Sequence, residues 1–335
     1  MTRARTVDIH SHILTKEAMQ RLARESPRVT PAWTDRTDRS ATMEIDGKVV
    51  QRPMPHEIWN LDWRLRDMDA NGVDMQLICP TTQTFFYDCE PQLGLACAAL
   101  QNEDIARVVK EHAGRFAGLA TVPMQAPELA AQELRRAMTT LGLKGMEIGS
   151  QVRGRNLDDP ALDPVWAAAE QLSAFIFIHP LAFGPRERLQ SYYLNNFVGL
   201  TFETTLAGAS LVFGGVLERY PDLQICLSHG GGYIPYQRGR FLHGWQVREE
   251  PKARLHGNPD TSIDRLYFDS ITHSAKALEY LVDVQGADHV LLGSDYPFDM
   301  GNLDCVRKVE EAQLQPAIRE RILGGRAREL LKLGD

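Results

Sequence analysis

The sequence predicts an α/β fold in which eight parallel strands alternate with helices and close into a (β/α)8 barrel. The first observation is that strand-like and helix-like segments alternate from one end of the chain to the other. The second is that the strands are apolar runs such as Phe175–Ile178, typical of strands covered on both faces. The third is that His or Asp stands at the end of several of these strands, which is where such barrels carry their active sites.

The first strand begins at Val7 and ends in two histidines. Residues 15–57 are irregular and polar, and within them Met43–Val50 predicts a hairpin that turns at Asp46-Gly47. We therefore expect residues 28–57 to form a small β-hairpin insertion after the first strand.

The rest of the chain continues the alternation. A helix with apolar Leu61, Leu65 and Met68 at helical spacing is expected to stop at Asn71-Gly72. Seven further strands are expected at Val73–Cys79, Phe116–Val122, Leu143–Ile148, Ala174–Ile178, Leu223–Ser228, Leu266–Asp269 and His289–Gly293. Helices are expected at about 91–112, 127–141, 161–172, 200–219, 233–246 and 274–285, followed by C-terminal helices at about 302–313 and 316–332.

Composition narrows the classes of function. The 335 residues are 43% hydrophobic, and no linker or repeat divides them, so we expect one domain over residues 1–335. A net charge of −7 without basic runs argues against nucleic acid as a partner, and no apolar stretch reaches the length of a membrane span. Five cysteines without a CxxC pair, and an N-terminus without room for a signal peptide, indicate a cytoplasmic protein with reduced thiols.

Histidine and aspartate mark four strand ends. His10 and His12, spaced i and i+2, share one face of the first strand, and His179, His229 and Asp295 follow the fifth, sixth and eighth strands. Each residue alone has an ordinary structural explanation, such as a core histidine or a helix cap. Together, His10, His12, His179 and Asp295 predict a site for Zn²⁺ or another divalent ion, with His229 as a fifth ligand or a base.

Four motifs carry a resemblance to a known family: Asp8–His12, His179-Pro180, Ser228–Gly232 and Gly293–Phe298. They resemble the amidohydrolase superfamily and, within it, the non-oxidative decarboxylase branch, the α-amino-β-carboxymuconate-ε-semialdehyde decarboxylase family. The resemblance runs end to end. It implies a distorted barrel that holds one Zn²⁺, with Mn²⁺ as the alternative, through the four residues above. It also implies that His229 is the catalytic acid/base beside Asp295.

The same resemblance extends to residues that contact the substrate. Arg52 stands where the family places an arginine for a substrate carboxylate, and Arg240 where it places one that is donated across a dimer interface. Phe298 would line the pocket. Tyr192-Tyr193 stands where the family has a tryptophan, so the pocket wall differs and the substrate is left open. The resemblance implies a homodimer, and we expect it to bind a small carboxylic acid and neither nucleic acid nor membrane.

The expected function is therefore that of a metal-dependent carboxy-lyase in aromatic compound catabolism. Its substrate would be a conjugated or aromatic acid, either an amino- or hydroxy-carboxymuconate semialdehyde or a hydroxybenzoate. The alternative is a metal-dependent hydrolase or hydratase of the same superfamily, because the same ligands serve either chemistry. The pair of arginines favours decarboxylation.

Overall fold

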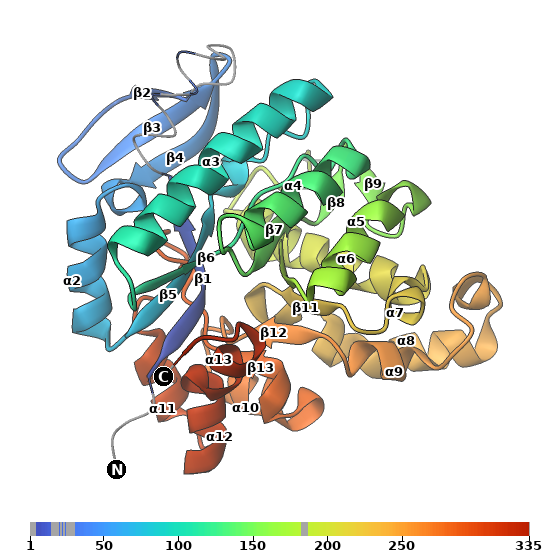
Figure 1. The fold of residues 1–335 in the computed structure, drawn as a ribbon. Helices are drawn as coiled ribbons and strands as arrows, with labels where there is room; N and C mark the ends of the chain where they lie inside the picture. Colours follow the sequence, from blue (N-terminus) through green and yellow to red (C-terminus); the bar gives the residue numbers. More distant parts are fainter. Residues whose placement is uncertain are drawn as a thin grey trace.

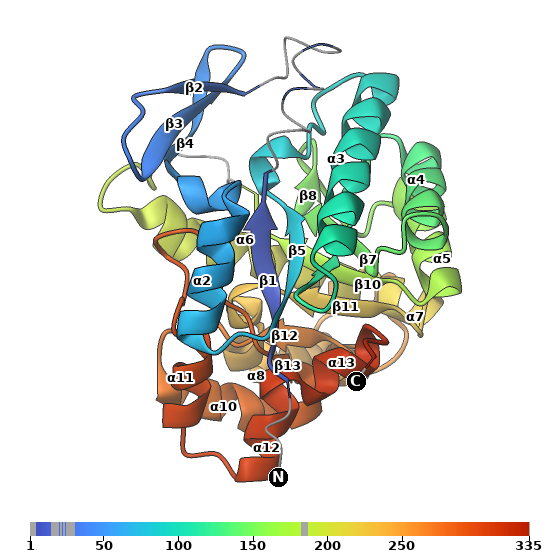
Figure 2. The same cartoon turned by 60° about the vertical axis from the view of Figure 1, so that its left-hand side comes forward.

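The computed structural model describes residues 5–14, 20, 22, 24, 31–181 and 187–334. Strands run through the middle of the molecule and helices cover them, as Figure 1 shows. Turned by 60°, the same cartoon shows β1 rising through the centre toward the end that carries the small antiparallel sheet (Figure 2).

The parallel strands of the described chain are β1 (Val7–Ile13), β5 (Met75–Pro80), β6 (Phe116–Gly118), β7 (Gly145–Gly149), β10 (Phe175–His179), β11 (Gln224–Leu227), β12 (Tyr267–Asp269) and β13 (Val290–Leu291). They fall into two sheets, ordered β1-β5-β6 and β13-β12-β11-β10-β7. The α/β class and the parallel strands are as predicted, but one continuous closed barrel sheet is not formed. The third and eighth strands are also shorter than predicted.

Single bridges connect the two sheets where the ladder is interrupted. Ser11 pairs with Tyr296 on one side and Ala120 with Met146 on the other. Beside the first bridge, the Asp8 carboxylate accepts hydrogen bonds from the Ser294 backbone N–H at 3.0 Å and from its hydroxyl at 2.6 Å. The Ser294 backbone N–H is therefore bonded to a side chain and not to a neighbouring strand, next to the two histidines of β1.

The helices are α2 (Leu61–Asn71), α3 (Pro91–Glu111), α4 (Pro127–Thr139), α5 (Asp163–Leu172), α6 (Thr201–Phe213), α7 (Val216–Arg219), α8 (Ile234–Val247), α9 (Pro259–Ile263), α10 (Ala275–Gln285), α11 (Cys305–Glu311), α12 (Pro316–Glu320) and α13 (Arg326–Leu330). Local chemistry sets several ends: the Asn60 side chain caps α2, which stops at Gly72 with φ 71°. The helix predicted over 200–219 is divided, because Gly215 adopts φ 68°. The one predicted over 316–332 is also divided, at Arg321–Gly325.

A small antiparallel sheet separates β1 from β5 in the chain. It contains β2 (Ala32–Thr34), β3 (Ser40–Ile45) and β4 (Lys48–Pro55). Ile45 pairs with Lys48, so the chain reverses at Asp46 and Gly47, and both hairpin strands are longer than the sequence indicated. Residues 28–30 of the expected insertion lie outside the described part of the chain.

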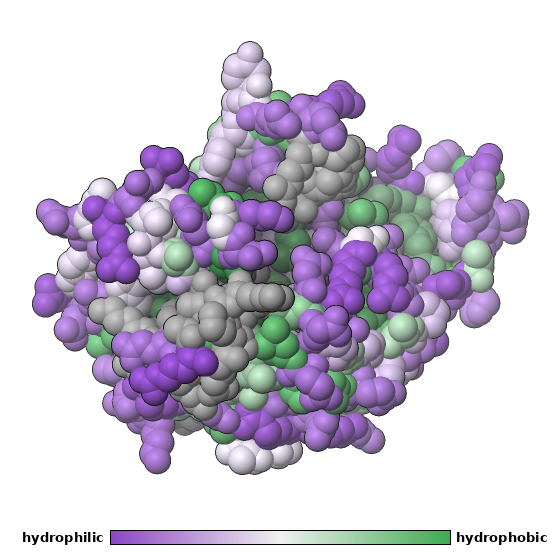
Figure 3. All heavy atoms as spheres, turned by 90° about the horizontal axis from the view of Figure 1, so that it is seen from above, coloured by the Kyte–Doolittle hydropathy of each residue, from purple (hydrophilic) through white to green (hydrophobic). Residues whose placement is uncertain are grey.

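The interior is apolar on both sides of the strands. Ile176 and Ile178 of β10 contribute to one buried cluster, and Phe175 and Phe177 to another, as expected for a strand with both faces covered. Seen from above Figure 1, the end of the molecule is mostly hydrophilic with hydrophobic residues toward a central hollow (Figure 3). Over the described residues, none of the helices has the length and hydropathy that crossing a membrane requires.

Candidate metal centre and active site

Four of the sequence-predicted residues converge at the carboxyl ends of the strands. One ligand atom from each of His10, His12, His179 and Asp295 lies within 4.8 Å of the others, and all four residues are buried. His10 Nε2 is 3.2 Å from His12 Nε2. Asp295 Oδ1 is 3.3 Å from His10 Nε2 and 3.2 Å from His12 Nε2.

Irregular backbone places these side chains. The pairing of β1 with β5 shifts register between Asp8 and Ser11, and such bulges are typical beside active sites because they redirect a side chain. Asp295 adopts φ 58°, and its backbone N–H donates to the His10 carbonyl at 2.8 Å. The carboxylate is therefore fixed beside the imidazoles by the backbone of β1 itself.

The three histidines present the same nitrogen to the centre. His10 Nδ1 lies 2.8 Å from Asp269 Oδ2, His12 Nδ1 3.3 Å from the Pro80 carbonyl, and His179 Nδ1 3.0 Å from the Pro180 carbonyl. Each of these oxygens accepts a hydrogen bond from Nδ1–H, so Nε2 is the nitrogen that faces the centre. Each imidazole would therefore bind a cation through Nε2, after loss of any proton that Nε2 carries.

Burial and neighbouring charges act on the titration of this cluster. Burial lowers the pKa of His10, but the Asp295 and Asp269 carboxylates outweigh it and raise the pKa to about 10. Burial would raise the pKa of Asp295, yet the imidazoles around it hold the value well below the usual range. Burial and the other imidazoles hold the pKa of His179 well below its usual range.

The arrangement fits a divalent transition-metal ion. The buried His179 Nε2 and Asp295 Oδ1 have no hydrogen-bond partner. Zinc–ligand bonds of about 2.0–2.1 Å place neighbouring ligand atoms about 3.3 Å apart, close to the separations between His10, His12 and Asp295. Three imidazoles and one carboxylate are a donor set that zinc accepts.

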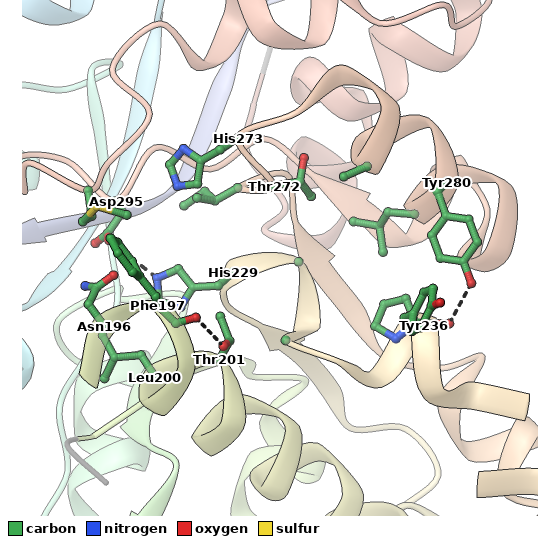
Figure 4. A pocket seen from close by; sticks show the side chains of 17 residues that line it. Asn196, Phe197, Leu200, Thr201, His229, Tyr236, Thr272, His273, Tyr280 and Asp295 are labelled. Carbon is green, nitrogen blue, oxygen red and sulfur yellow. Dashed lines mark hydrogen bonds and ion pairs between the residues drawn. The ribbon is translucent and has the colours of Figure 1, made fainter. Parts of the chain in front are cut away.

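His229 lies beside this cluster on a strained loop. It adopts φ 53°, and the three following glycines also have positive φ. A Cβ on Gly232 would lie 2.2 Å from the Thr201 carbonyl oxygen, so glycine is required there. The loop directs His229 Nε2 to 3.5 Å from Asp295 Oδ2, as Figure 4 shows. This imidazole therefore faces the cluster without belonging to it.

Two cavities meet at His229 and Asp295. One, of about 450 Å³, is mainly apolar and includes Phe197, Tyr236 and Tyr280 (Figure 4). The other, of about 510 Å³, is more polar and runs between β4 and the strand ends. Both open beside the His/Asp cluster, so a small ligand in either reaches His229.

The predicted substrate-contacting residues divide into two groups. Arg52, Tyr193 and Phe298 line the polar cavity together with His179, and the Phe298 ring lies 5.4 Å from that of His12. Tyr192, which is 86% exposed, and Arg240, also exposed, line neither of these cavities. The structure therefore brings three of the five to the site within a single chain.

Sequence reasoning missed four buried polar residues around the cluster: Cys79, Glu147, Asp269 and Arg64. Glu147 Oε1 is 3.6 Å from His12 Nδ1, Cys79 Sγ is 3.8 Å from the same nitrogen, and Arg64 donates to the His12 carbonyl. The available signals were a glutamate inside an apolar strand and an aspartate at the end of the seventh strand, where the other ends carry ligands.

Known proteins resemble this chain over nearly its whole length. The family model described as amidohydrolase matches residues 7–333. A 2-amino-3-carboxymuconate-6-semialdehyde decarboxylase of Dictyostelium discoideum is 38% identical, over 99% of this chain and 92% of that protein. One of the same name from Caenorhabditis elegans is 27% identical, over 92% of this chain and 90% of that protein. The crystal structure of 5-carboxyvanillate decarboxylase from Sphingomonas paucimobilis has a TM-score of 0.85 at 24% identity, covering 99% of this chain and 100% of that one.

Proposed function

Because this chain belongs to the amidohydrolase family, we propose that it is a metal-dependent, non-oxidative decarboxylase of conjugated or aromatic carboxylic acids. The observation that carries the proposal is the convergence of four ligand side chains beside His229, at the junction of two cavities. A conjugated acid suits such a site, because breaking the bond to CO₂ leaves an electron pair that a conjugated system accepts.

The substrate we favour is an amino- or hydroxy-carboxymuconate semialdehyde, and hydroxybenzoates are the second choice. The relative from Dictyostelium discoideum carries the name of a decarboxylase of the first type and is similar over nearly the whole chain. Tyr193 and Phe298 in the wall of the polar cavity leave room for either a planar chain or a ring.

We propose Zn²⁺ as the resident cation, held by His10, His12, His179 and Asp295. When bound, it would supply a Lewis acid that lowers the pKa of water toward about 7 and polarises an oxygen of the substrate. Mn²⁺ is the alternative that the donor set permits. Metal analysis of the purified protein distinguishes the two.

His229 is proposed to move the proton that decarboxylation requires. The bond between the substrate carbon and its carboxylate breaks, CO₂ leaves, and the electron pair stays on that carbon until a proton replaces the lost group. His229 Nε2 faces the cluster, while its Nδ1 is buried without a hydrogen-bond partner. Nε2 is thus the nitrogen placed to deliver the proton to the reacting carbon or to take it from water.

Arg52 is proposed to bind a substrate carboxylate in the polar cavity. Its guanidinium is 68% exposed, and its ion pair with Asp35 Oδ2 is long at 3.8 Å and open to solvent, so a substrate carboxylate can compete for it. We expect Arg52→Gln to raise KM about 10- to 100-fold with a smaller effect on kcat, equivalent to roughly 1.5–3 kcal/mol for a hydrogen bond to a charged group. Steady-state kinetics check this, with the more exposed Arg39→Gln as control. An unchanged KM in Arg52→Gln would remove Arg52 from the binding site.

Arg240 is proposed to act in a homodimer, on the site of the neighbouring subunit. Arg238, two residues earlier, is engaged by Asp260 at 2.8 Å and Asp264 at 2.7 Å, whereas Arg240 is exposed on α8. Light scattering of the protein in solution checks the dimer: a monomeric mass contradicts it.

We further propose that residues 1–335 form one domain, which a single cooperative unfolding transition would support and two separate transitions would contradict.

The activity itself is tested with a panel of carboxymuconate semialdehydes and hydroxylated benzoates. We expect loss of substrate absorbance to coincide with release of one CO₂ per molecule consumed. Removal of metal by a chelator should abolish the activity, and added Zn²⁺ or Mn²⁺ should restore it. Substrate consumption without CO₂ would instead indicate a hydrolase or hydratase, and full activity after complete metal removal would contradict the metal-dependent chemistry.

A further inference from the structure

Asp269, at the end of β12, is fully buried and contacts both the ligand histidine His10 and the loop that carries His229. Its Oδ2 accepts from His10 Nδ1 at 2.8 Å and from the His229 backbone N–H at 2.9 Å. Its Oδ1 accepts from the Gly230 backbone N–H at 2.8 Å and from that of Ile271 at 3.1 Å. One carboxylate therefore joins a metal-ligand histidine to the loop that carries the proposed acid/base.

We propose that Asp269 is the positioning residue that couples the metal centre to His229. It holds His10 in the tautomer that presents Nε2 to the cation. It also fixes the position of the His229 loop relative to that cation. The proposal rests on the proposed roles of His10 and His229, and it extends them to a residue on a third strand.

The backbone of the His229 loop has an unfavourable conformation that must be stabilised by its surroundings. His229 is a non-glycine residue at φ 53°, and Gly230 follows at φ 61°. Strained conformations of this kind persist only where the surroundings determine them. Two consecutive backbone N–H groups donate to one carboxylate here, which fixes the direction in which the His229 side chain leaves the loop.

Asp269 is not placed to bind the cation itself. It lies on the Nδ1 side of His10, whereas the cluster of ligand atoms lies on the Nε2 side. Each of its two oxygens already accepts hydrogen bonds from two N–H groups. Its effect on the metal therefore passes through His10, in the way that carboxylates behind zinc-bound histidines commonly act.

The near-isosteric Asp269→Asn tests this sharply. Each carboxylate oxygen of Asp269 accepts hydrogen bonds from two N–H groups. In the asparagine variant one of these oxygens becomes an NH₂ group, which cannot accept, so one of the two pairs of N–H groups loses its acceptor in either orientation of the amide. Facing His10, the NH₂ group favours the tautomer with the proton on Nε2, which blocks metal binding. Facing Gly230 and Ile271, it releases the loop. Both orientations separate the metal centre from His229.

We expect the Zn²⁺ dissociation constant of Asp269→Asn, measured by competition with a chromophoric chelator, to rise about 10- to 100-fold. Amide hydrogen exchange should accelerate in the peptide covering residues 228–232 and stay unchanged in α4. At saturating Zn²⁺, kcat should fall while KM stays within twofold of the parent. The control is Asp283→Asn, an exposed carboxylate of α10, which should match the parent in all three measurements.

A Zn²⁺ affinity within twofold of the parent together with unchanged exchange over residues 228–232 overturns the proposal. Accelerated exchange throughout the protein also overturns it, because Asp269 would then serve general stability. If Asp269→Asn does not fold, Asp269→Ser is measured in the same way, and failure of both to reach the parent circular dichroism counts against a positioning role. The affinity and exchange measurements need no substrate, so their results are valid even if the parent protein releases no CO₂. Absence of CO₂ release by the parent would contradict the proposed function and not the role of Asp269.

Discussion

Replacing His229 with alanine is expected to leave the protein folded and loaded with metal while CO₂ release falls by about 10²- to 10⁴-fold. The reason is that His229 faces the cluster, with Nε2 3.5 Å from Asp295 Oδ2, but lies outside the group of four convergent ligand atoms. Losing a positioned proton donor typically reduces a rate by about this factor. Metal analysis and a CO₂ assay on the same preparation check both halves of the prediction.

The control for this variant lies in the same cavity. His273 is a second imidazole lining the apolar cavity, on the turn that follows β12 (Figure 4). His273→Ala should retain far more activity than His229→Ala. A large loss in His273→Ala with normal turnover in His229→Ala would transfer the acid/base role to His273. Loss of metal from His229→Ala would instead make His229 a ligand, the alternative that its sequence position left open.

Replacing His179 with alanine is expected to remove the metal and, with it, all measurable CO₂ release. His179 is buried and supplies one of the four convergent ligand atoms, and its Nε2 has no partner in the protein. Removing a ligand should weaken binding by more than the 10- to 100-fold typical of changes behind the ligands. Elemental analysis after dialysis checks this, and heat unfolding adds an independent measurement.

The unfolding experiment separates loss of a ligand from loss of the fold. An ion that binds only the folded state raises Tm, so Zn²⁺ should raise the Tm of the metal-free parent and leave that of His179→Ala unchanged. His243→Ala, which replaces an exposed histidine of α8, is the matched control and should respond like the parent. If His179→Ala retains a full equivalent of Zn²⁺ after dialysis, the four-residue site is wrong.

The convergence of the candidate residues could be predicted from the sequence where one residue at a strand end was sufficient. Parallel strands bring their carboxyl ends to one edge, so His10, His179 and Asp295 were expected together before any distance was known. Arg52, Tyr193 and Phe298 line a cavity at this edge, but their expected roles came from family resemblance. Arg240 lines neither cavity, and its proposed role requires a second subunit.

The residues behind the ligands were not predicted. Asp269 and Glu147 lie on strands that are distant in sequence from the histidines they approach, and a pattern along one strand does not show which side chain lies behind a histidine on another. The contact between Asp8 and Ser294 was missed for the same reason, since the two residues are 286 positions apart in the chain.

By itself, the sequence determined the α/β alternation, the strand ends that carry chemistry and the kinds of ligand available, because apolar periodicity and residue type are local properties. Only the tertiary structure decided which nitrogen of each imidazole faces inward, where the sheet is interrupted and which carboxylate joins His10 to the His229 loop. Those outcomes depend on hydrogen bonds between segments that meet only when the whole chain is packed.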